Sequence, residues 1–526
     1  MNIIDKVVGF VSPKHALQRA ITRQAVNAVE QGGFGYGNHG ASTRKSSMAG
    51  FQTQAGSAIE DIEYNVGTLR ERSRDLFMGA PIATGALRGM VTNIVGAGLK
   101  LNTQIDYEYL GLTPEEGDAW ETKVEREFAF WAESKNCDTT RMSNFYELQQ
   151  LVFLSYLMSG DVFTTLPMIQ RVGTPYELTV QVIEADRVCN PTVNTFLDEK
   201  LINGVEIDSK GEIVAYHVAK YHPSSVFSIQ NKWTRIEKYG SKSGRPNILH
   251  LMDVERPEQR RGVPILAPVV ELLKQLSRYS DAELMSAVIS SMFTAFVTTE
   301  APPNPELGGV SDGDQIDPDN DDTVELGNGV VNFLREGETV SFANPNRTNT
   351  AFDSFVTSIC RQIGVALEIP YEVLMKHFTS SYSASRGALL EAWKMYKKRR
   401  EWMANGFCQP IYELFLVEAV AKGRIYAPGF FTDPLVKHAY CKAEWNGPTQ
   451  GQLDPEKEVR AAELRVKGGY STRTRETTEL TGGDFFKNHD LRVMEEKVRK
   501  EAGLVEEALA TVPIDEQREE VEKNED

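Results

Sequence analysis

An amphipathic pattern of unusual length follows Pro264 in this chain. From Ile265 to Thr299 apolar residues recur every three or four positions, as they do on one face of a helix. Glycine is absent from this run, and Pro264 suits a first helical position because its missing N–H would be unpaired there. As one helix the run would span about 50 Å, at roughly 1.5 Å per residue. The pattern predicts a long helical rod, although periodicity alone is also compatible with a helix buried inside a large enzyme.

The region before this rod mixes helical and strand patterns. Thr113 and Glu116 have the spacing of a capping box, in which hydroxyl and carboxylate bond each other's backbone N–H. The helix after them places Val124 and Phe128 on one apolar face. Helices and strands do not alternate regularly, which favours an α+β fold over βαβ units. The predicted helices cover residues 61–95, 113–131 and 144–158, and the predicted strands cover 162–168, 178–183, 213–218 and 248–252.

The chain changes character after the rod. Pro302, Pro303 and Pro305 would break any helix, and an Asp-rich loop follows them. Pro410 is expected to kink a later helix. In chain order we predict strands over 323–335 and 339–343, a helix over 350–365, a hydroxyl-rich turn over 379–385, a helix over 386–422, a strand over 435–444 and helical sequence over 454–526 with an acidic tail.

Length and charge restrict the classes of function. A chain of 526 residues is too long for one core, so several subdomains are expected. Lys and Arg number 57 against 74 Asp and Glu, which gives a net charge of −17. An acidic chain is a poor general DNA binder, because affinity for phosphates comes from cations that release counterions. It remains compatible with a protein that lets DNA pass without holding it tightly.

Cysteine spacing and hydropathy indicate the compartment. The five cysteines are dispersed and odd in number, which argues against a disulfide framework or a zinc site and fits a reducing cytosol. No run of 18 apolar residues occurs, and the N-terminal pattern is not that of a signal peptide, so no membrane association is expected. Residues 1–57 end in a stretch rich in Gly, Ser and Asn. Such a stretch cannot bury enough apolar area to offset the conformational entropy lost on ordering, which predicts a flexible arm.

Several short motifs match catalytic or ligand-binding patterns without their context. Gly35–Gly40 fits G-x-G-x-x-G but lacks a preceding strand, and Gly309–Gly313 fits the nucleophile elbow but lies in the Asp-rich loop. That loop is either a solvated acidic segment or, less simply, a site for a hard divalent cation. The eight histidines show no ligand spacing. We therefore predict no catalytic residue, no resident metal and no cofactor.

A basic cluster on the helix over 386–422 has two interpretations. It is either a solvated or salt-bridged helix face, or a stripe that faces a neighbouring subunit or phosphates, and periodicity does not choose between them. The cluster consists of Lys394, Lys397, Lys398, Arg399 and Arg400.

Several short sequence segments and the order of the predicted elements together resemble the portal proteins of tailed bacteriophages, in the lambda-type family. The likeness covers about residues 60–505, and no single motif is decisive. The segments that carry it are Phe145–Gln149, Ser159–Asp161, Gln259–Val263, Ser380–Arg386, Leu389–Glu391 and Glu444–Pro448.

The resemblance implies a portal fold with an α/β wing, a two-helix stem, a small α/β clip insert, a long kinked wing helix and a helical C-terminal crown. The implied parts are a flexible N-terminal arm (1–57), the first part of the wing (58–261), a stem helix (262–300), the clip (301–349), a second stem helix (350–370), a tunnel loop (371–385), the kinked wing helix and wing return (386–453), and the crown with an acidic tail (454–526).

The resemblance also implies a function without chemistry of its own. Family members form a ring, usually a dodecamer, at one capsid vertex of the virion, and double-stranded DNA passes through it during packaging and ejection. Implied partners are the terminase large subunit, the major capsid protein and a head-completion or connector protein. Such a ring also initiates capsid assembly in the host cytoplasm.

Three groups of residues are candidates for these roles. For the DNA channel, with an ordinary loop as the alternative, they are Lys376, His377, Thr379, Ser380 and Ser381. For the stem interface they are Leu273, Leu276, Val288, Met292, Phe296, Phe355 and Ile359. For docking of the packaging motor on the clip they are Asp312, Asp314, Asp317, Asp319, Asp321 and Asp322.

Two other classes of function remain open at this point. A metal-dependent nuclease or other DNA-processing enzyme could use the Asp-rich loop, but it would need inward carboxylates on rigid strands holding metals about 4 Å apart. A sequence-reading DNA-binding protein would need a basic face, which the acidic composition does not favour.

Overall fold

The computed structural model describes residues 53–191, 200–291, 295–299, 338–342, 352–378, 381–451 and 454–504, with scattered positions before residue 52. The chain divides into two compact units, 1–61 and 62–526, and the second contains every element that matters below. None of the helices in this described part is long and apolar enough to cross a lipid bilayer.

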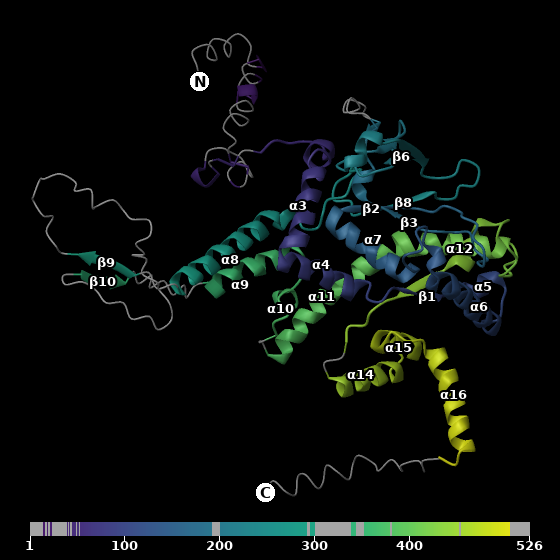
Figure 1. The fold of residues 1–526 in the computed structure, drawn as a ribbon. Coiled ribbons are helices and arrows are strands. Elements are labelled where there is room, and N and C mark those ends of the chain that lie inside the picture. The colour runs from purple at the N-terminus through teal and green to yellow at the C-terminus, as the bar shows by residue number, and fades with distance from the viewer. Residues whose placement is uncertain are drawn as a thin grey trace, which may run out of the picture. The chain divides into compact units, whose positions relative to one another are not determined.

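Helices and small antiparallel sheets make up the second unit (Figure 1). The helices are α3 (Val66–Gly79), α4 (Pro81–Ile94), α5 (Tyr107–Leu110), α6 (Pro114–Glu133), α7 (Phe145–Ser159), α8 (Val270–Ser291), α9 (Phe352–Ala366), α10 (Tyr371–Leu374), α11 (Tyr382–Met403), α12 (Gln409–Ala421), α13 (Pro434–Cys441), α14 (Pro455–Lys467), α15 (Arg473–Thr481) and α16 (Phe485–Glu501). The strands are β1 (Lys100–Thr103), β2 (Asp161–Thr165), β3 (Gln181–Ile183), β4 (Leu201–Ile202), β5 (Val205–Ile207), β6 (Ile213–Ala219), β7 (Trp233–Glu237), β8 (Ile248–Met252), β9 (Ala295–Thr299), β10 (Glu338–Phe342) and β11 (Ala443–Asn446).

The main core joins segments that lie far apart in the sequence. Phe128 of α6 makes edge-to-face ring contacts with Phe145 of α7, with Tyr412 and Phe415 of α12, and with Trp445 of β11. Such pairs add about 0.5–1.5 kcal/mol each to the gain from burial. The apolar face predicted for α6 is therefore confirmed as core, and it fixes α6 and α7 against α12 and β11.

A second, smaller core belongs to the sheets. β2 pairs antiparallel with β3 on one side and β8 on the other, and a separate sheet runs in the order β4-β5-β6-β7. Phe163 of β2, Tyr216 of β6 and Ile248 of β8 pack together with less than 2% of each exposed. The predicted α+β class is confirmed, and the strands predicted near residues 162, 178, 213 and 248 are all present.

The predicted capping box at Thr113 is confirmed, and the structure adds a second one at the start of α7 that the sequence analysis did not single out. Thr113 and Glu116 form a reciprocal capping box at α6. Asn144 and Glu147 form a second one at α7, which ends at Gly160 with a left-handed φ of 84°. These caps satisfy N–H groups that have no partner within the helix.

The rod predicted over 265–299 is wrong at both ends. The α-helix covers only Val270–Ser291, after a 3₁₀ turn over Ala267–Val269. Ala295–Thr299 is instead strand β9, which pairs antiparallel with β10. The β-branched residues Val297, Thr298 and Thr299 fit a strand better than a helix, because their χ1 freedom is restricted there. β10 confirms the strand predicted over 339–343, whereas residues 323–335 lie outside the described part.

Two further elements differ from or refine the sequence interpretation. The strand predicted over 435–444 is wrong: Asp433 accepts a hydrogen bond from the N–H of Leu435 and caps helix α13, and strand β11 begins only at Ala443. The helical sequence predicted over 386–422 is confirmed, with an earlier start at Tyr382 and an interruption before Pro410. A π-helical turn over Ala404–Cys408 separates α11 from α12, just before Pro410, which cannot donate a backbone N–H.

Candidate functional site

Two segments singled out in the sequence, Ser159–Asp161 and Gln259–Val263, meet at a buried charge cluster. Arg261 is 1% exposed, and its Nε donates to Asp161 at 2.6 Å. The rest of its guanidinium donates to the backbone carbonyls of Ala185, Val188 and Asn203, each at 2.7 Å. Every donor direction of Arg261 therefore has a partner, which is the condition for burying a charge.

A second arginine reaches the same carboxylate from helix α3. Arg70 is 3% exposed, donates through Nε to the carbonyl of Ser159 at 2.8 Å, and contacts Asp161 Oδ1 at 2.8 Å. His250 of β8 lies 3.4 Å from Asp161 Oδ2 and stacks on the ring of Phe163 at a centroid distance of 4.2 Å. One carboxylate thus joins α3, β2, β8 and the segment that leads into α8.

The electrostatics of the cluster favour a permanently ionised Asp161. Burial alone would raise the pKa of Asp161, but the charges of Arg261 and Arg70 outweigh it and hold that pKa well below its ordinary value. Burial lowers the pKa of His250 more than the bond to Asp161 raises it, so its imidazole is neutral at pH 7. The cluster is therefore an ion-pair clamp, with no group that changes charge near neutral pH.

Backbone contacts complete the clamp. Glu63, 2% exposed, accepts the backbone N–H groups of Arg260 and Arg261 at 2.7 and 2.9 Å. Gly160 and Gly262 approach so closely that a Cβ on Gly262 would collide with the carbonyl of Gly160. Only glycine fits there. The root of α8 is consequently fixed to the sheet region.

Helices α8 and α9 form a pair that projects from this clamp (Figure 1). Tyr279 of α8 lies against Phe352 and Phe355 of α9, with ring centroids 5.4 and 4.8 Å apart. Near the root, Leu273 and Leu276 are buried in the main core. The apolar face that begins there continues outward beyond the part that the core covers.

The predicted stem-interface residues divide into two sets. Leu273, Leu276 and Ile359 pack within their own chain, with 1%, 4% and 7% exposed. Val288 and Phe355 are 41% and 47% exposed. Met292 lies outside the described residues, and only the backbone of Phe296 is described, in β9.

Sequence reasoning missed two exposed apolar neighbours of Val288. Leu284 and Met285 are 67% and 59% exposed, and with Val288 they form a stripe at spacings of three and four residues. Single large apolar side chains on a surface are ordinary, whereas three on one helix face form a patch. The regular period of the whole helix concealed where coverage by its own chain ends.

The predicted channel residues are only partly described. Lys376 has a left-handed φ of 53°, and Lys376 and His377 are exposed just after α10. Ser381 is exposed and caps α11 by accepting a hydrogen bond from the N–H of Ala384 at 3.4 Å. Thr379 and Ser380 lie outside the described residues. The segment over 371–385 therefore contains a short helix and the first residues of α11, and between them Lys376, His377, Phe378 and Ser381 are exposed.

The basic cluster on α11 is mostly engaged within the chain. Lys394 pairs with Glu391 at 2.7 Å, and Lys397 pairs with Glu479 at 3.5 Å. Arg400 donates to the backbone carbonyls of Ile94 and Asn93, and Arg399 donates to the hydroxyl of Tyr156. Of the two interpretations, the salt-bridged helix face describes these side chains.

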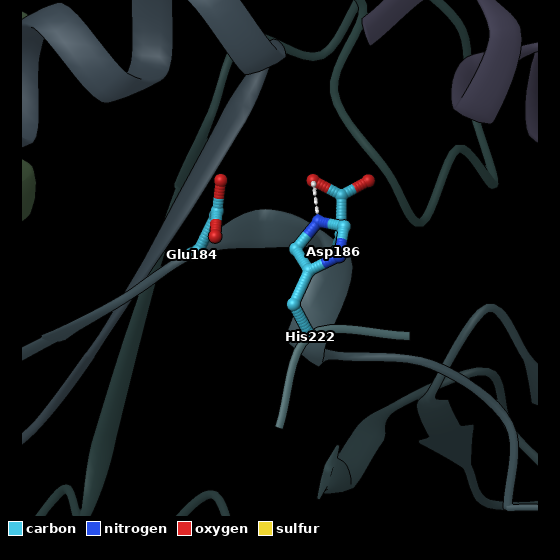
Figure 2. A group of neighbouring side chains, drawn as sticks. All are labelled: Glu184, Asp186 and His222. Atoms are coloured by element: carbon cyan, nitrogen blue, oxygen red, sulfur yellow. Dashed lines mark ion pairs between the residues drawn. The ribbon is translucent and has the colours of Figure 1, made fainter. Parts of the chain in front are cut away.

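One group of side chains has the composition of a metal site. Glu184, Asp186 and His222 bring their ligand atoms within 4.8 Å of one another (Figure 2). Arg74 already pairs with both carboxylates. His222 Nδ1 accepts the N–H of Ser224 at 3.1 Å, so in the neutral ring Nε2 carries the proton that faces Asp186. Arg74 thus balances the charge of both carboxylates, and the contacts describe an ion-pair network.

The aspartates predicted to dock the packaging motor, Asp312 to Asp322, lie outside the described residues. Their arrangement is left as a prediction from sequence.

The family model and the relatives with similar sequences point to the same family. The family model described as phage portal protein, lambda family, matches residues 44–400. Portal protein B of Escherichia phage lambda is 24% identical over 464 residues, covering 84% of this chain and 86% of that protein. The portal protein of Escherichia phage N15 is 24% identical over 494 residues, covering 90% of each. A solved chain from the neck of a gene transfer agent particle is 12% identical, with a TM-score of 0.41, and covers 79% of this chain and 93% of that one.

Proposed function

The chain belongs to the lambda family of phage portal proteins, and we propose that it forms a closed ring, of twelve copies, at one vertex of the capsid. Double-stranded DNA would enter and leave the virion through the centre of this ring. The ring would be assembled in the host cytoplasm, where it would also initiate the capsid. The chain itself would supply binding surfaces and no chemistry, with no cofactor.

One observation carries the ring proposal. The apolar stripe of Leu284, Met285 and Val288 lies on a helix whose root is clamped by Asp161, so it is presented at a fixed angle. In a ring each copy offers one surface to a different surface of the next copy. Burial of apolar area at about 25 cal/mol per Å² then stabilises every contact around the ring.

Electron microscopy of the purified full-length protein tests this proposal directly. We expect end-on views of closed rings with a central opening wide enough for a DNA duplex. A compact monomer under all solution conditions, with α8 and α9 covered by the same molecule, would contradict it.

In this proposal each part of the portal fold corresponds to a residue range of the chain. Residues 58–261 and 386–453 form the wing, α8 and α9 form the two-helix stem within 262–300 and 350–370, and 301–349 form the clip. Residues 371–385 form the tunnel loop, and 454–526 form the crown and acidic tail. The clamp at Asp161 would then hold stem to wing.

The partners in this proposal follow from these positions. The terminase large subunit docks on the clip during packaging, a head-completion or connector protein docks there afterwards, and the major capsid protein surrounds the wing. A net charge of −17 suits a conduit, because a duplex must slide past without the many phosphate contacts that give tight binding.

Deleting residues 311–322 should leave rings intact and prevent motor docking, because the deletion removes the Asp-rich loop and none of the α8–α9 pair. Ring formation is checked by microscopy, and docking by co-sedimentation with the terminase large subunit. Normal packaging by the protein that lacks residues 311–322 would contradict the clip assignment.

A nuclease assay tests the alternative function. If the purified protein cut DNA with a divalent metal, and lost that activity on mutation of Asp317 and Asp319, the nuclease alternative would replace the conduit.

Replacing Lys376 with alanine should weaken retention of packaged DNA about tenfold or less per contact while rings still form, because Lys376 is exposed beside the proposed constriction and would contact phosphates lightly. Alanine at Thr379 and Ser380 should act in the same direction. Retention is measured as nuclease-protected DNA per particle. Lys398→Ala, an exposed lysine on α11, is the matched control, and equal retention in both would move the constriction elsewhere.

A further inference from the structure

The C-terminal helices α14–α16 are attached to the rest of the second unit mainly by charge. Among the described residues, the main hydrophobic core and the side chains packed against it extend as far as Trp445 and include none from these three helices. In α14, only Ala462 is a buried apolar residue, and α16 has none within its described span. Apolar burial, the usual source of a fixed contact, is therefore small here.

Three ion pairs bridge the gap. Arg386 of α11 lies 4.0 Å from Glu458, Lys397 of α11 lies 3.5 Å from Glu479, and Glu125 of α6 lies 2.6 Å from Lys487. The lysines and Arg386 are about half exposed, so each pair is screened by salt and stabilises the contact only weakly. Contacts of this kind hold a segment in place without locking it.

Two cavities lie in the same contact region. One of about 610 Å³ separates α11 and β11 from α14 and α15, with Trp393, Trp445 and Lys457 in its wall. The other, of about 180 Å³, separates α6 and β1 from the start of α16, with Thr474 and Phe486 in its wall. Both cavities are partly open to solvent, so this contact is packed less closely than a domain interior, which suits a contact that opens and closes.

The smaller cavity collects carboxylates from both sides. Glu121, Glu125 and Asp118 come from α6, and Asp484 comes from the N-terminus of α16. Lys487 is the cation that faces them, at 2.6 Å from Glu125 and 3.5 Å from Asp484. The remaining lining residues come from β1 and the residue after it, from α6, from α15 and from α16, and they are uncharged: Asn102, Thr103, Gln104, Thr122, Thr474 and Phe486.

We propose that residues 454–501 form a C-terminal latch, and that protonation of Glu121 strengthens its closure against α6. Four carboxylates face one lysine in the closed latch, so a proton on one of them removes repulsion. Glu125 and Asp484 pair with Lys487, and Asp118 is exposed on α6. Glu121 is half-buried, and its Oε1 accepts the N–H of Ile105 at 2.7 Å.

The direction of the pH effect follows from linkage. Burial, with added repulsion from Glu125, Asp118 and Asp484, raises the pKa of Glu121 to about 7 in the closed latch. Opening would admit water to Glu121, which reduces the largest cause, and would remove the repulsion from Asp484, so the pKa falls from about 7 in the direction of its ordinary value of 4.5. The repulsion from Glu125 and Asp118, which lie on α6 beside Glu121, remains. The closed form therefore binds the proton more tightly, and closure strengthens by up to about tenfold per pH unit as the pH falls below 7. Above pH 7 Glu121 is ionised in both forms, and closure is at its weakest.

Accessibility of a thiol in the smaller cavity reports the opening. The full-length protein carrying Thr474→Cys is reacted with an uncharged thiosulfonate reagent at pH 6 and pH 8, and the parent chain gives the background from native cysteines. The rate is divided by that of Arg492→Cys, whose side chain is exposed on α16, which removes the intrinsic pH dependence of thiol reactivity. We expect the normalised rate to be up to about tenfold higher at pH 8.

The variant Glu121→Gln tests whether Glu121 causes the pH dependence of the thiol reaction rate. Glutamine keeps the oxygen that accepts the Ile105 N–H and mimics the protonated side chain, so its normalised rate should stay low at both pH values. Raising the salt concentration from 50 to 500 mM should increase opening in both proteins, because the three bridging pairs are screened. A normalised rate in the parent background that does not change with pH would overturn the proposal, as would an unaltered pH response in Glu121→Gln.

Discussion

Replacing Asp161 with alanine is expected to lower the free energy of unfolding by about 3–5 kcal/mol, the cost of removing one partner from a buried ion pair. The loss is at the upper end because two buried guanidinium groups, those of Arg70 and Arg261, would both lose their counter-charge. The N–H of Gly262, which donates to the same carboxylate at 3.1 Å, would also lose its acceptor. Thermal unfolding followed by calorimetry measures the effect as a clearly lowered melting temperature.

A matched control lies on the same helix as Arg70. Asp75 of α3 is exposed, so Asp75→Ala should change stability by less than about 0.5 kcal/mol. The double variant Asp161→Ala, Arg70→Met should recover part of the loss, since it removes one of the stranded charges. If Asp161→Ala unfolded at the same temperature as Asp75→Ala, the clamp would have no role in stability.

The same cluster shows what a single sequence could and could not predict. Its two segments, Ser159–Asp161 and Gln259–Val263, stood out because they resemble a known family, but nothing in the sequence near either segment indicated that they are in contact. Asp161 and Arg261 are 100 residues apart, and Arg70 is 91 residues from Asp161. Long-range pairing of charges leaves no periodic trace, because only the folded chain brings the partners together. The Arg261 side chain could equally have been a surface cation before α8.

Local signals were more reliable where one physical effect dominated. The capping box at Thr113 predicts a helix start, because the side-chain bonds form within three residues of chain. The boundary near Ser291 failed because apolar spacing suited both helix and strand, and pairing of β9 with a strand about 40 residues later decided between them. Asp433-Pro434 was a helix-start signal that the apolar alternation after it concealed.

The exposed face of α8 shows a third limit of prediction from sequence, which is that apolar spacing does not distinguish a buried face from an exposed one. The apolar spacing predicts one continuous apolar face along α8, but the structure divides this face into a buried and an exposed part. Leu273 and Leu276 pack in the main core of the same chain, whereas Leu284, Met285 and Val288 are exposed. The pattern is the same along the helix, so only the position of the core reveals where a neighbour is needed. In the proposed ring, the part of the face that a neighbouring copy would cover is therefore its outer half.

Replacing Leu284 or Val288 with aspartate is accordingly expected to abolish ring formation while leaving the monomer folded. Both side chains are exposed in the single chain, at 67% and 41%, so an aspartate there costs the monomer little. In a ring the same carboxylate would be buried against apolar groups without a partner, which costs several kcal/mol at each contact. Because every copy carries the change, the penalty recurs at each interface of the closed ring.

Gln275→Asp provides the control for this loss of assembly. Gln275 is exposed on α8, nine residues before Leu284, so at 100° per residue it points to the opposite side of the helix. Rings counted by microscopy, with mass measured in solution, should be absent for the two stripe variants and normal for Gln275→Asp. An aspartate in the stripe that still gave full rings would mean that copies meet through another surface. Loss of rings in all three variants would mean that charge anywhere on α8 is harmful, and the stripe would lose its special role.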